Sequence, residues 1–262
     1  MHYDTLLDAI ADPDRAEIDA REIAIVTAHP DDETLAFGVI MRRLKGVRLV
    51  LATDGSPRDM QTQRRLGFES VEAYRDARHA ELTAALALAG VTSSALTRLE
   101  FPDKEAAHNL AAFAAKLRAF FAAHGIRAVL THAYEGGHPD HDAVAAAVAL
   151  AVRGSAIEVV ESPFYRSRNG RYAVQSFTPI DGSPVIETRL TPEEAAHKLA
   201  MVACYPSQAA LLGGFQPRVE RFRHMPAYDF ACPPNDGDVD FEKLFFPWTD
   251  WAKATAHAFA AA

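Results

Sequence analysis

The sequence predicts an α/β fold with a doubly wound, mainly parallel sheet, helices on both faces, and a hairpin-and-helix extension at the C-terminus. Short apolar runs alternate with helical patterns up to about residue 165, which is the order that builds parallel βαβ units. Beyond that point the alternation stops. The length of 262 residues suits one large core. We therefore expect a single domain over residues 1–262, with its core at about 22–165 and the extension at about 166–262.

Each element of the parallel part has its own signal. Residues 23–29 are small and β-branched apolar residues that end in a histidine, as expected for a strand buried on both faces. Residues 34–46 follow at helical spacing and end at Gly46, a residue type that often closes helices. The same alternation predicts further strands at 47–55, 96–103, 126–133 and 156–165, and helices at about 70–89, 109–125 and 141–153. A sheet of this kind is Rossmann-like.

The two ends of the chain have weaker signals. Residues 171–180 and 184–190 are interpreted as the two strands of a hairpin. Residues 191–205 are interpreted as a helix with a capping box between Thr191 and Glu194. A short helix is also expected at residues 2–11. The Pro-rich segment 226–262 shows no clear periodicity and could cover a pocket or a neighbouring subunit.

The overall charge narrows the classes of partner. The formal net charge is −8 and the pI is about 5.8, which argues against nucleic acid or an anionic membrane surface as the main partner. No apolar run has the length of a transmembrane helix, and the acidic N-terminal segment lacks the order of a signal peptide. The two cysteines, Cys204 and Cys232, are expected to be reduced. We therefore expect a cytoplasmic protein, with a homo-oligomer left open.

Histidines and acids follow two of the predicted strands at the point where each strand ends. The stretch AHPDDE (28–33) comes after the first strand, and GHPDH (137–141) follows the fourth. Because the carboxyl ends of parallel strands meet at one edge of a sheet, these clusters should converge. Taken alone, Asp31 or Asp32 could simply cap a helix, and Gly136-Gly137 could simply make a turn. The coincidence of two His-Pro-Asp clusters at one edge favours a shared site.

Two histidines and one carboxylate with open positions form a known catalytic metal arrangement, and zinc suits such mixed nitrogen and oxygen ligands. We predict that His29 and Asp32 from the first cluster and His141 from the second bind one divalent ion. Zinc is favoured, with ferrous iron as the alternative under reducing conditions. The charge of the ion would offset the cost of burying these polar groups.

The other polar residues of the clusters then have roles around the ion. Asp31 is free to act as general base toward a water that the metal activates. His138, when protonated, could stabilise an oxyanion or protonate a leaving amine. Asp140 would hold one of the histidines in orientation. The two clusters together therefore predict a catalytic site rather than a passive one.

The motifs AHPDDE and GHPDH, in this order and spacing, resemble those of the LmbE/PIG-L family of zinc-dependent deacetylases, and the likeness extends from about residue 22 to about 225. The resemblance implies a hydrolase that removes an acetyl group from an N-acetylglucosamine-type amino sugar or its conjugate, a small-molecule substrate. The stretch ARHAEL (77–82) resembles the R-x-x-E helix of the family. This likeness implies that Arg78 reaches the substrate and that Glu81 helps to fix it.

The sequence departs from the family pattern near the expected substrate pocket. Thr53-Asp54-Gly55-Ser56 stands where some members have Thr-x-Gly-Glu, and Glu135-Gly136-Gly137 precedes His138 where some thiol-sugar deacetylases have a tyrosine. The late stretch CYPSQ (204–208) resembles a family S-Q element, and Lys198 before it is expected to be structural or near the site. These departures leave the metal residues intact and leave the acceptor sugar open.

Two alternatives to a deacetylase remain from the sequence. The first is an amidase that cleaves larger N-acyl groups from sugar conjugates, which activity on acyl groups of different size would separate. The second is a non-catalytic metal-binding module with a Rossmann-like fold. Nucleotide binding is disfavoured because the stretch 28–38 contains no GxGxxG and presents carboxylates where phosphates would need backbone N–H groups.

Overall fold

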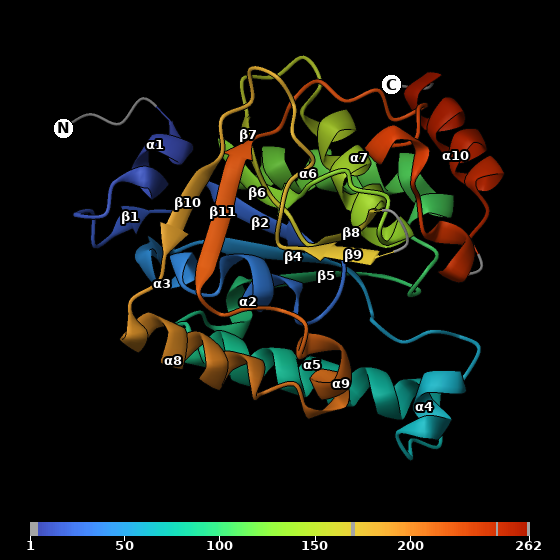
Figure 1. The fold of residues 1–262 in the computed structure, drawn as a ribbon, viewed down its shortest axis with the longest axis horizontal. Coiled ribbons are helices and arrows are strands. Elements are labelled where there is room, and N and C mark those ends of the chain that lie inside the picture. The colour runs from blue at the N-terminus through green and yellow to red at the C-terminus, as the bar shows by residue number, and fades with distance from the viewer. Residues whose placement is uncertain (1–4, 169–170, 245, 261–262) are drawn as a thin grey trace.

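The computed structural model describes residues 5–168, 171–244 and 246–260. Its centre is a seven-stranded sheet, shown in Figure 1. In spatial order the strands are β10 (Ile186–Arg189), β11 (Val219–His224), β7 (Glu158–Ser162), β6 (Ala128–His132), β2 (Ile23–Thr27), β4 (Arg48–Thr53) and β5 (Leu96–Phe101). The run from β7 to β5 is parallel, and β11 pairs antiparallel with both β10 and β7. The predicted doubly wound, mainly parallel sheet is confirmed.

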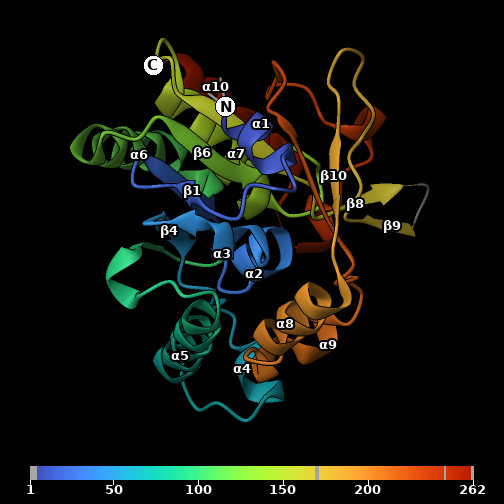
Figure 2. The same cartoon turned by 90° about the vertical axis from the view of Figure 1, so that its left-hand side faces the viewer.

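Helices cover both faces of the sheet, as the two views in Figures 1 and 2 show. One face carries α6 (Leu110–His124), α7 (Pro139–Val152) and α10 (Trp248–Ala260). The other carries α1 (Leu6–Ala11), α2 (Asp32–Phe37), α3 (Ile40–Arg43), α5 (Val71–Leu88), α8 (Pro192–Val202) and α9 (Ala209–Leu212). The helix α4 (Gln61–Arg65) lies in the connection between β4 and α5. Each face has its own apolar core, so every residue of β2 and β6 is buried.

Several helix starts follow from local chemistry. The side chain of Ser70 caps α5 by accepting the N–H of Ala73. Thr191 and Glu194 form the predicted capping box at α8, which is confirmed. The helix α7 begins inside the GHPDH stretch, with His138 at the cap position and a proline at the first helical position. The fold therefore places the second histidine cluster at the start of a helix.

The predicted single helix over 34–46 is instead two short helices, α2 and α3, separated at Gly38 and Val39. The carboxylate of Glu220, on β11, accepts the N–H groups of Val39 and Ile40 at 2.8 and 3.1 Å. Lys198 donates to the same carboxylate at 2.7 Å, so its role in this structure is to pair with Glu220. The predicted helix end at Gly46 is wrong, because Gly46 follows the short strand β3 (Leu44–Lys45), which pairs with β1 (Ile18–Asp19).

The predicted hairpin between 171–180 and 184–190 is also wrong. The strand β9 (Arg171–Val174) pairs with β8 (Tyr165–Arg168), while Ile186–Arg189 joins the main sheet beside β11. Both segments were recognised as strands, but the second pairs with a strand that lies about thirty residues later in the chain. The helix expected at 2–11 corresponds to α1, which begins at Leu6. Residues 2–4 of the expected range lie outside the described residues.

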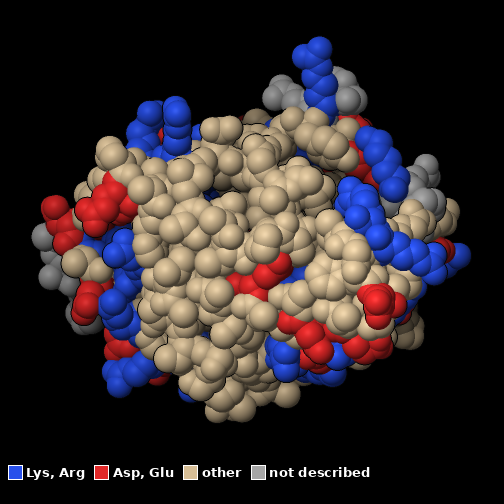
Figure 3. All heavy atoms as spheres, turned by 90° about the horizontal axis from the view of Figure 1, so that it is seen from below, with Lys and Arg blue, Asp and Glu red and all other residues tan. Residues whose placement is uncertain are grey.

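The surface and the cysteines complete the description. Figure 3 shows the face over α5, α8 and α9 from below: much of it is uncharged, Asp and Glu lie near its middle and toward one side, and most Lys and Arg lie toward its edges. Cys204 and Cys232 are free thiols, as the sequence predicted. Among the helices of the described ranges, none is both long and apolar enough to cross a membrane.

Candidate metal centre

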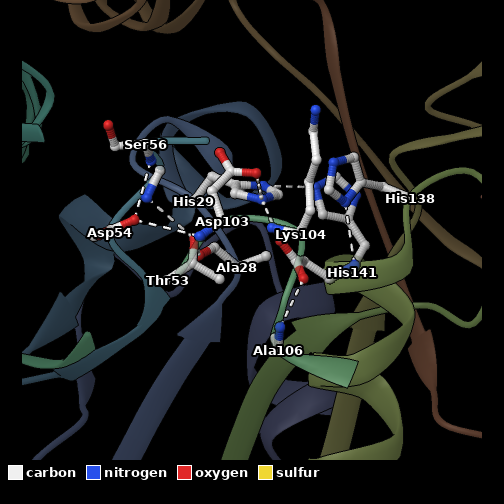
Figure 4. Close-up of polar contacts among 12 residues, drawn as sticks. Ala28, His29, Thr53, Asp54, Ser56, Asp103, Lys104, Ala106, His138 and His141 are labelled. Atoms are coloured by element: carbon white, nitrogen blue, oxygen red, sulfur yellow. Dashed lines mark hydrogen bonds and ion pairs between the residues drawn. The ribbon is translucent and has the colours of Figure 1, made fainter. Parts of the chain in front are cut away.

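The two histidine clusters meet at the carboxyl edge of the sheet. The strands β2 and β6 are hydrogen-bonded neighbours, so the chain that leaves each of them emerges at the same place. As a result, Nδ1 of His29 lies 3.2 Å from Nε2 of His141, although the two residues are 112 positions apart in the chain. Figure 4 shows His29 pointing toward His138 and His141. The convergence expected from the sequence is present.

The donor atoms of the predicted ligands have the spacing that a metal ion requires. The carboxylate of Asp32 lies 3.5 Å from Nδ1 of His29 and 3.4 Å from Nε2 of His141. Ligands held at zinc bond lengths around a tetrahedral ion are separated by about 3.3 Å. All three side chains are buried, and two ring nitrogens that face each other at 3.2 Å need a shared proton or a cation between them. The chemistry of His29, Asp32 and His141 therefore fits a divalent ion.

The orientation of His29 is fixed from behind by Asp140. Nε2 of His29 lies 3.1 Å from the Asp140 carboxylate, which also accepts the N–H groups of Lys104 and Ala106 at 2.6 and 3.1 Å. Because one ring nitrogen is bound to this carboxylate, the other is directed to the centre. Burial opposes the imidazolium, yet Asp140 and Asp32 raise the pKa of His29 well above its ordinary value. The centre therefore attracts positive charge strongly.

Asp31 has a different environment from Asp32. Among the described residues it belongs to none of the groups that could hold an ion. It sits at the cap position of α2, but its side chain makes no capping bond, so the simpler interpretation of Asp31 as a helix cap is wrong. Its φ of 121° is strained for a non-glycine residue. Burial raises the pKa of this carboxyl well above its usual range, and the charge of Arg78 opposes the rise.

Arg78 and Glu81, the two predicted residues of α5, contact different parts of the protein. The Arg78 guanidinium is buried and donates to the Asp31 carboxylate at 2.9 Å and to the carbonyl oxygens of Pro30 and Gly55 at 2.5 and 2.9 Å. Glu81 accepts the N–H and the hydroxyl of Ser207 at 2.9 and 2.6 Å. Arg78 thus orients the predicted base, and Glu81 ties α5 to the S-Q element. Their contact with a substrate stays a prediction.

His138 lies next to the predicted ligands and also belongs to two groups of side chains that could hold an ion, one with His29 and His141 and one with His29, Asp103 and Asp140. Its Nδ1 accepts the N–H of Asp140 at 3.1 Å, and its ring centroid lies 4.7 Å from that of His29. Burial lowers the pKa of His138 well below its ordinary value, and the neighbouring histidines lower it further. The ring is therefore neutral, with its proton on Nε2. This favours the predicted role as a hydrogen-bond donor over that of a charged acid.

Asp103 is a member of the site that the sequence reasoning missed. Its carboxylate lies 3.9 Å from Nε2 of His29, and Figure 4 shows it beside that ring. It also lines a cavity of about 410 Å³ with Lys104, His108 and Phe246 among others. A signal was present, because Asp103 lies two residues after the end of the strand β5, at the same carboxyl edge as the histidine clusters.

His132, at the end of β6, lies behind the centre. Its Nε2 accepts the N–H of Ala28 at 3.0 Å, and its ring stacks on that of His141 with centroids 4.3 Å apart. Its Nδ1 is buried without a partner. The bond to Ala28 occupies the lone pair of Nε2, which also lies 3.3 Å from the Asp32 carboxylate. His132 nevertheless belongs, with Asp32 and His141, to a group of side chains that could hold an ion.

Comparisons with known proteins were made on the whole chain. The profile of a family described as PIG-L, GlcNAc-PI de-N-acetylase, matches residues 24–152 and so spans both histidine clusters. No curated protein sequence matches significantly.

Several solved structures share the fold. The antimicrobial reagent A40926 pseudoaglycone deacetylase is 20% identical over 80% of this chain and 99% of its own, with a TM-score of 0.62. The N,N'-diacetylchitobiose deacetylase of Pyrococcus horikoshii is 17% identical over 86% of this chain and 94% of its own, with a TM-score of 0.52. The 4-carboxy-2-hydroxymuconate hydratase of Pseudomonas putida is 15% identical over 81% and 98%, also at 0.52. One fold thus carries more than one reaction, and the site has to decide between them.

Proposed function

Since the chain belongs to the PIG-L (LmbE-like) GlcNAc-PI de-N-acetylase family, we propose that it is a metal-dependent hydrolase that removes the acetyl group from an N-acetylglucosamine-type amino sugar or its conjugate. The observation that carries this proposal is the close approach of His29, Asp32 and His141: their facing ring nitrogens are 3.2 Å apart, one Asp32 oxygen lies 3.5 Å from Nδ1 of His29, and the other lies 3.4 Å from Nε2 of His141. Asp31 lies beside them and belongs to none of the groups of described residues that could hold an ion. Two of the similar structures are deacetylases, one acting on diacetylchitobiose, which supports this class of substrate.

In this proposal His29, Asp32 and His141 hold one divalent ion, and their mixed nitrogen and oxygen donors favour zinc. When bound, such an ion polarises the acetyl carbonyl and makes an attacking water more acidic. Asp140 keeps His29 in the orientation that this binding requires, through the contact at 3.1 Å.

The side chains around the ion carry the proton transfers. Asp31 accepts a proton from the water whose oxygen bonds to the acetyl carbon, while Arg78 keeps the carboxylate in place. Nε2–H of His138 donates a hydrogen bond to the oxygen that gains negative charge. The C–N bond then breaks, the amine nitrogen receives the proton held by Asp31, and acetic acid and a free amine form. The acid gives up its remaining proton to the amine or to solvent, so acetate is the form released. Substrate, water and products balance without a further reactant.

The cavity of about 410 Å³ beside Asp103 supports a seat for the sugar at this edge. Its wall includes carboxylate, ammonium and aromatic groups, which are suited to a polyhydroxylated ring. We also propose that the whole chain works as one domain, because β11 of the extension pairs with β7 of the parallel sheet and shares its core.

The test is acetate release from a panel of N-acetylated amino sugars by protein loaded with zinc or iron, beside the same sugars with longer N-acyl groups. We expect turnover of acetyl substrates by the wild type. Asp31→Asn should retain the metal and lose about 10²–10⁴-fold in kcat, because only the base is removed. Preference for longer acyl groups would favour the amidase, and normal kcat in Asp31→Asn would exclude Asp31 as the base.

A further inference from the structure

The loop that carries His138 is enclosed by two distant segments. We call residues 134–138 the histidine loop and residues 234–240 the C-terminal clamp. A Cβ added to Gly136, whose φ is +74°, would lie 2.7 Å from Val239 of the clamp, and one added to Gly137 would lie 2.0 Å from the carbonyl oxygen of Tyr165. The loop is therefore pressed between the clamp on one side and β8 on the other, with no room for side chains at its two glycines.

Hydrogen bonds connect the clamp to the backbone of the histidine loop. Asp240 donates its N–H to the carbonyl of Gly136 at 2.8 Å. The side-chain amide of Asn235 donates to the carbonyl of Glu135 and accepts the hydroxyl of Thr178. An amide can do both at once, whereas an ionised carboxylate of the same shape has no hydrogen to donate. Asn235 therefore joins the loop to the segment after β9.

The rest of the loop is held from its own side of the fold. The Asp142 carboxylate, on α7, accepts the N–H groups of Glu135 and Gly136 at 2.9 and 2.8 Å. The N–H groups of Glu135 and Gly136 are thus bound to α7, and the carbonyl groups of the same two residues are bound to the clamp. If the carbonyl side is released, the loop keeps its bonds to Asp142 and Phe164 but loses those that fix the carbonyls of Glu135 and Gly136, directly before His138.

We propose that the C-terminal clamp positions His138, with Asn235 as the positioning residue that acts through the Glu135 carbonyl. This inference rests on the proposed function. The clamp supplies no donor atom to the metal groups among the described residues, and it lies beyond the family match at 24–152. The ring of His138 stands 4.7 Å from that of His29, so a loop shift of about 1 Å changes where its Nε2–H points and can cost up to about 10²-fold in rate.

The test compares two substitutions at Asn235 with one at its neighbour. Asn235→Gly removes the amide and tolerates the observed φ of 53°, and Asn235→Asp keeps the shape but loses the donor. Asp236→Gly is the matched control, because Asp236 is exposed and has a similar φ of 55°. We expect both Asn235 variants to lose about tenfold or more in kcat with KM and metal content unchanged. The control should match the wild type.

Hydrogen–deuterium exchange of the peptide containing 134–138 gives a readout that needs no activity. We expect faster exchange in Asn235→Gly than in Asp236→Gly. If the Asn235 variants melt at lower temperature but keep wild-type kcat per bound metal, the residue is only structural and the proposal is overturned. If the wild type releases no acetate, the proposed function fails, and unchanged exchange in Asn235→Gly would then overturn the clamp as well.

Discussion

The parallel half of the chain, residues 23–162, and the extension, residues 165–260, contribute to the centre in different ways. Every donor atom of the candidate metal groups comes from the first, and within the described ranges none comes from the second. Yet the extension contacts both segments that carry the histidine clusters: Tyr205 donates to Glu33, and Asp240 donates to Gly136. The chemistry and the positioning of the chemistry are therefore encoded in separate stretches of sequence.

The geometry of an open sheet explains this division. Loops that leave the carboxyl ends of parallel strands contact the sheet on one side only, so another part of the chain has to contact their other side. Glu33, the third acid of AHPDDE, accepts the N–H of Asp31 at 3.1 Å. Its carboxylate is buried and therefore needs further hydrogen-bond partners. Tyr205 supplies one of them. If this comparison is correct, substitution of the predicted ligands, which all lie in the parallel half, should abolish metal binding, while substitutions in the extension should leave the metal in place.

The largest effect is expected from His141→Ala in the parallel half. Removing one of three ligands should reduce bound zinc or iron from near one per chain to a small fraction, measured by elemental analysis, and should abolish acetate release. His257→Ala, on the exposed side of α10, is the matched control. If the His141→Ala protein keeps its full metal content, His141 is not a ligand. The assignment of metal binding to the parallel half would then lose its main support.

A smaller effect is expected at Glu135, where the two halves meet. One carboxylate oxygen accepts the N–H of Phe164 at 2.7 Å, and the other is buried without a partner. Burial raises the pKa of Glu135 from 4.5 to about 8. A raised carboxyl pKa means that the folded state binds the proton more tightly, so stability is lost as pH rises from about 4.5 through about 8.

Glu135→Gln should remove this pH dependence, because glutamine stays neutral. Relative to wild type it should gain about 3 kcal/mol or more in free energy of unfolding between pH 5 and pH 9, measured by urea titration at equal metal loading. Parallel pH curves for the two proteins would show that Glu135 is ionised throughout. This substitution tests the junction of the two halves without altering the predicted ligands.

The smallest effect is expected from Tyr205→Phe in the extension. Its hydroxyl donates to the buried Glu33 carboxylate at 2.5 Å, and the loss of this bond should cost about 1–2 kcal/mol of unfolding free energy. Metal content should remain that of the wild type. A double-mutant cycle with Glu33→Gln supplies the control, since the cost of Tyr205→Phe should shrink when Glu33 is already neutral. Equal costs in both backgrounds would contradict the coupling.

The parallel sheet was predictable because its signals are local. The apolar run at 23–29 and the helical spacing at 109–125 each specify an element from neighbouring residues alone. The break between α2 and α3 was not predictable, because it depends on Glu220, about 180 positions further along. The pairing of Ile186–Arg189 with β11 was not predictable for the same reason. The sequence of a short strand does not specify which of several possible strands it pairs with.

The candidate site was also predictable only where its signals are local. His29, Asp32 and His141 follow from residue types at strand ends and from the rule that those ends meet. Asp103 obeys the same rule and could have been found with it. Asn235 could not, since it contacts the histidine loop through one hydrogen bond from a segment with no motif of its own. Tyr205 lies in the CYPSQ stretch, but nothing in that stretch indicates that its hydroxyl bonds to Glu33.

The backbone of Asp31 has a consequence for how this protein can change. A non-glycine residue at φ 121° carries a conformational cost of about 1–3 kcal/mol, which the rest of the fold must absorb. Glycine at this position would relieve that cost, but it would also leave the buried Arg78 guanidinium without its carboxylate partner, which costs about 3–5 kcal/mol. The ion pair with Arg78 therefore holds Asp31 in its strained conformation, and selection of variants for heat resistance alone should retain the acid that the proposed reaction uses.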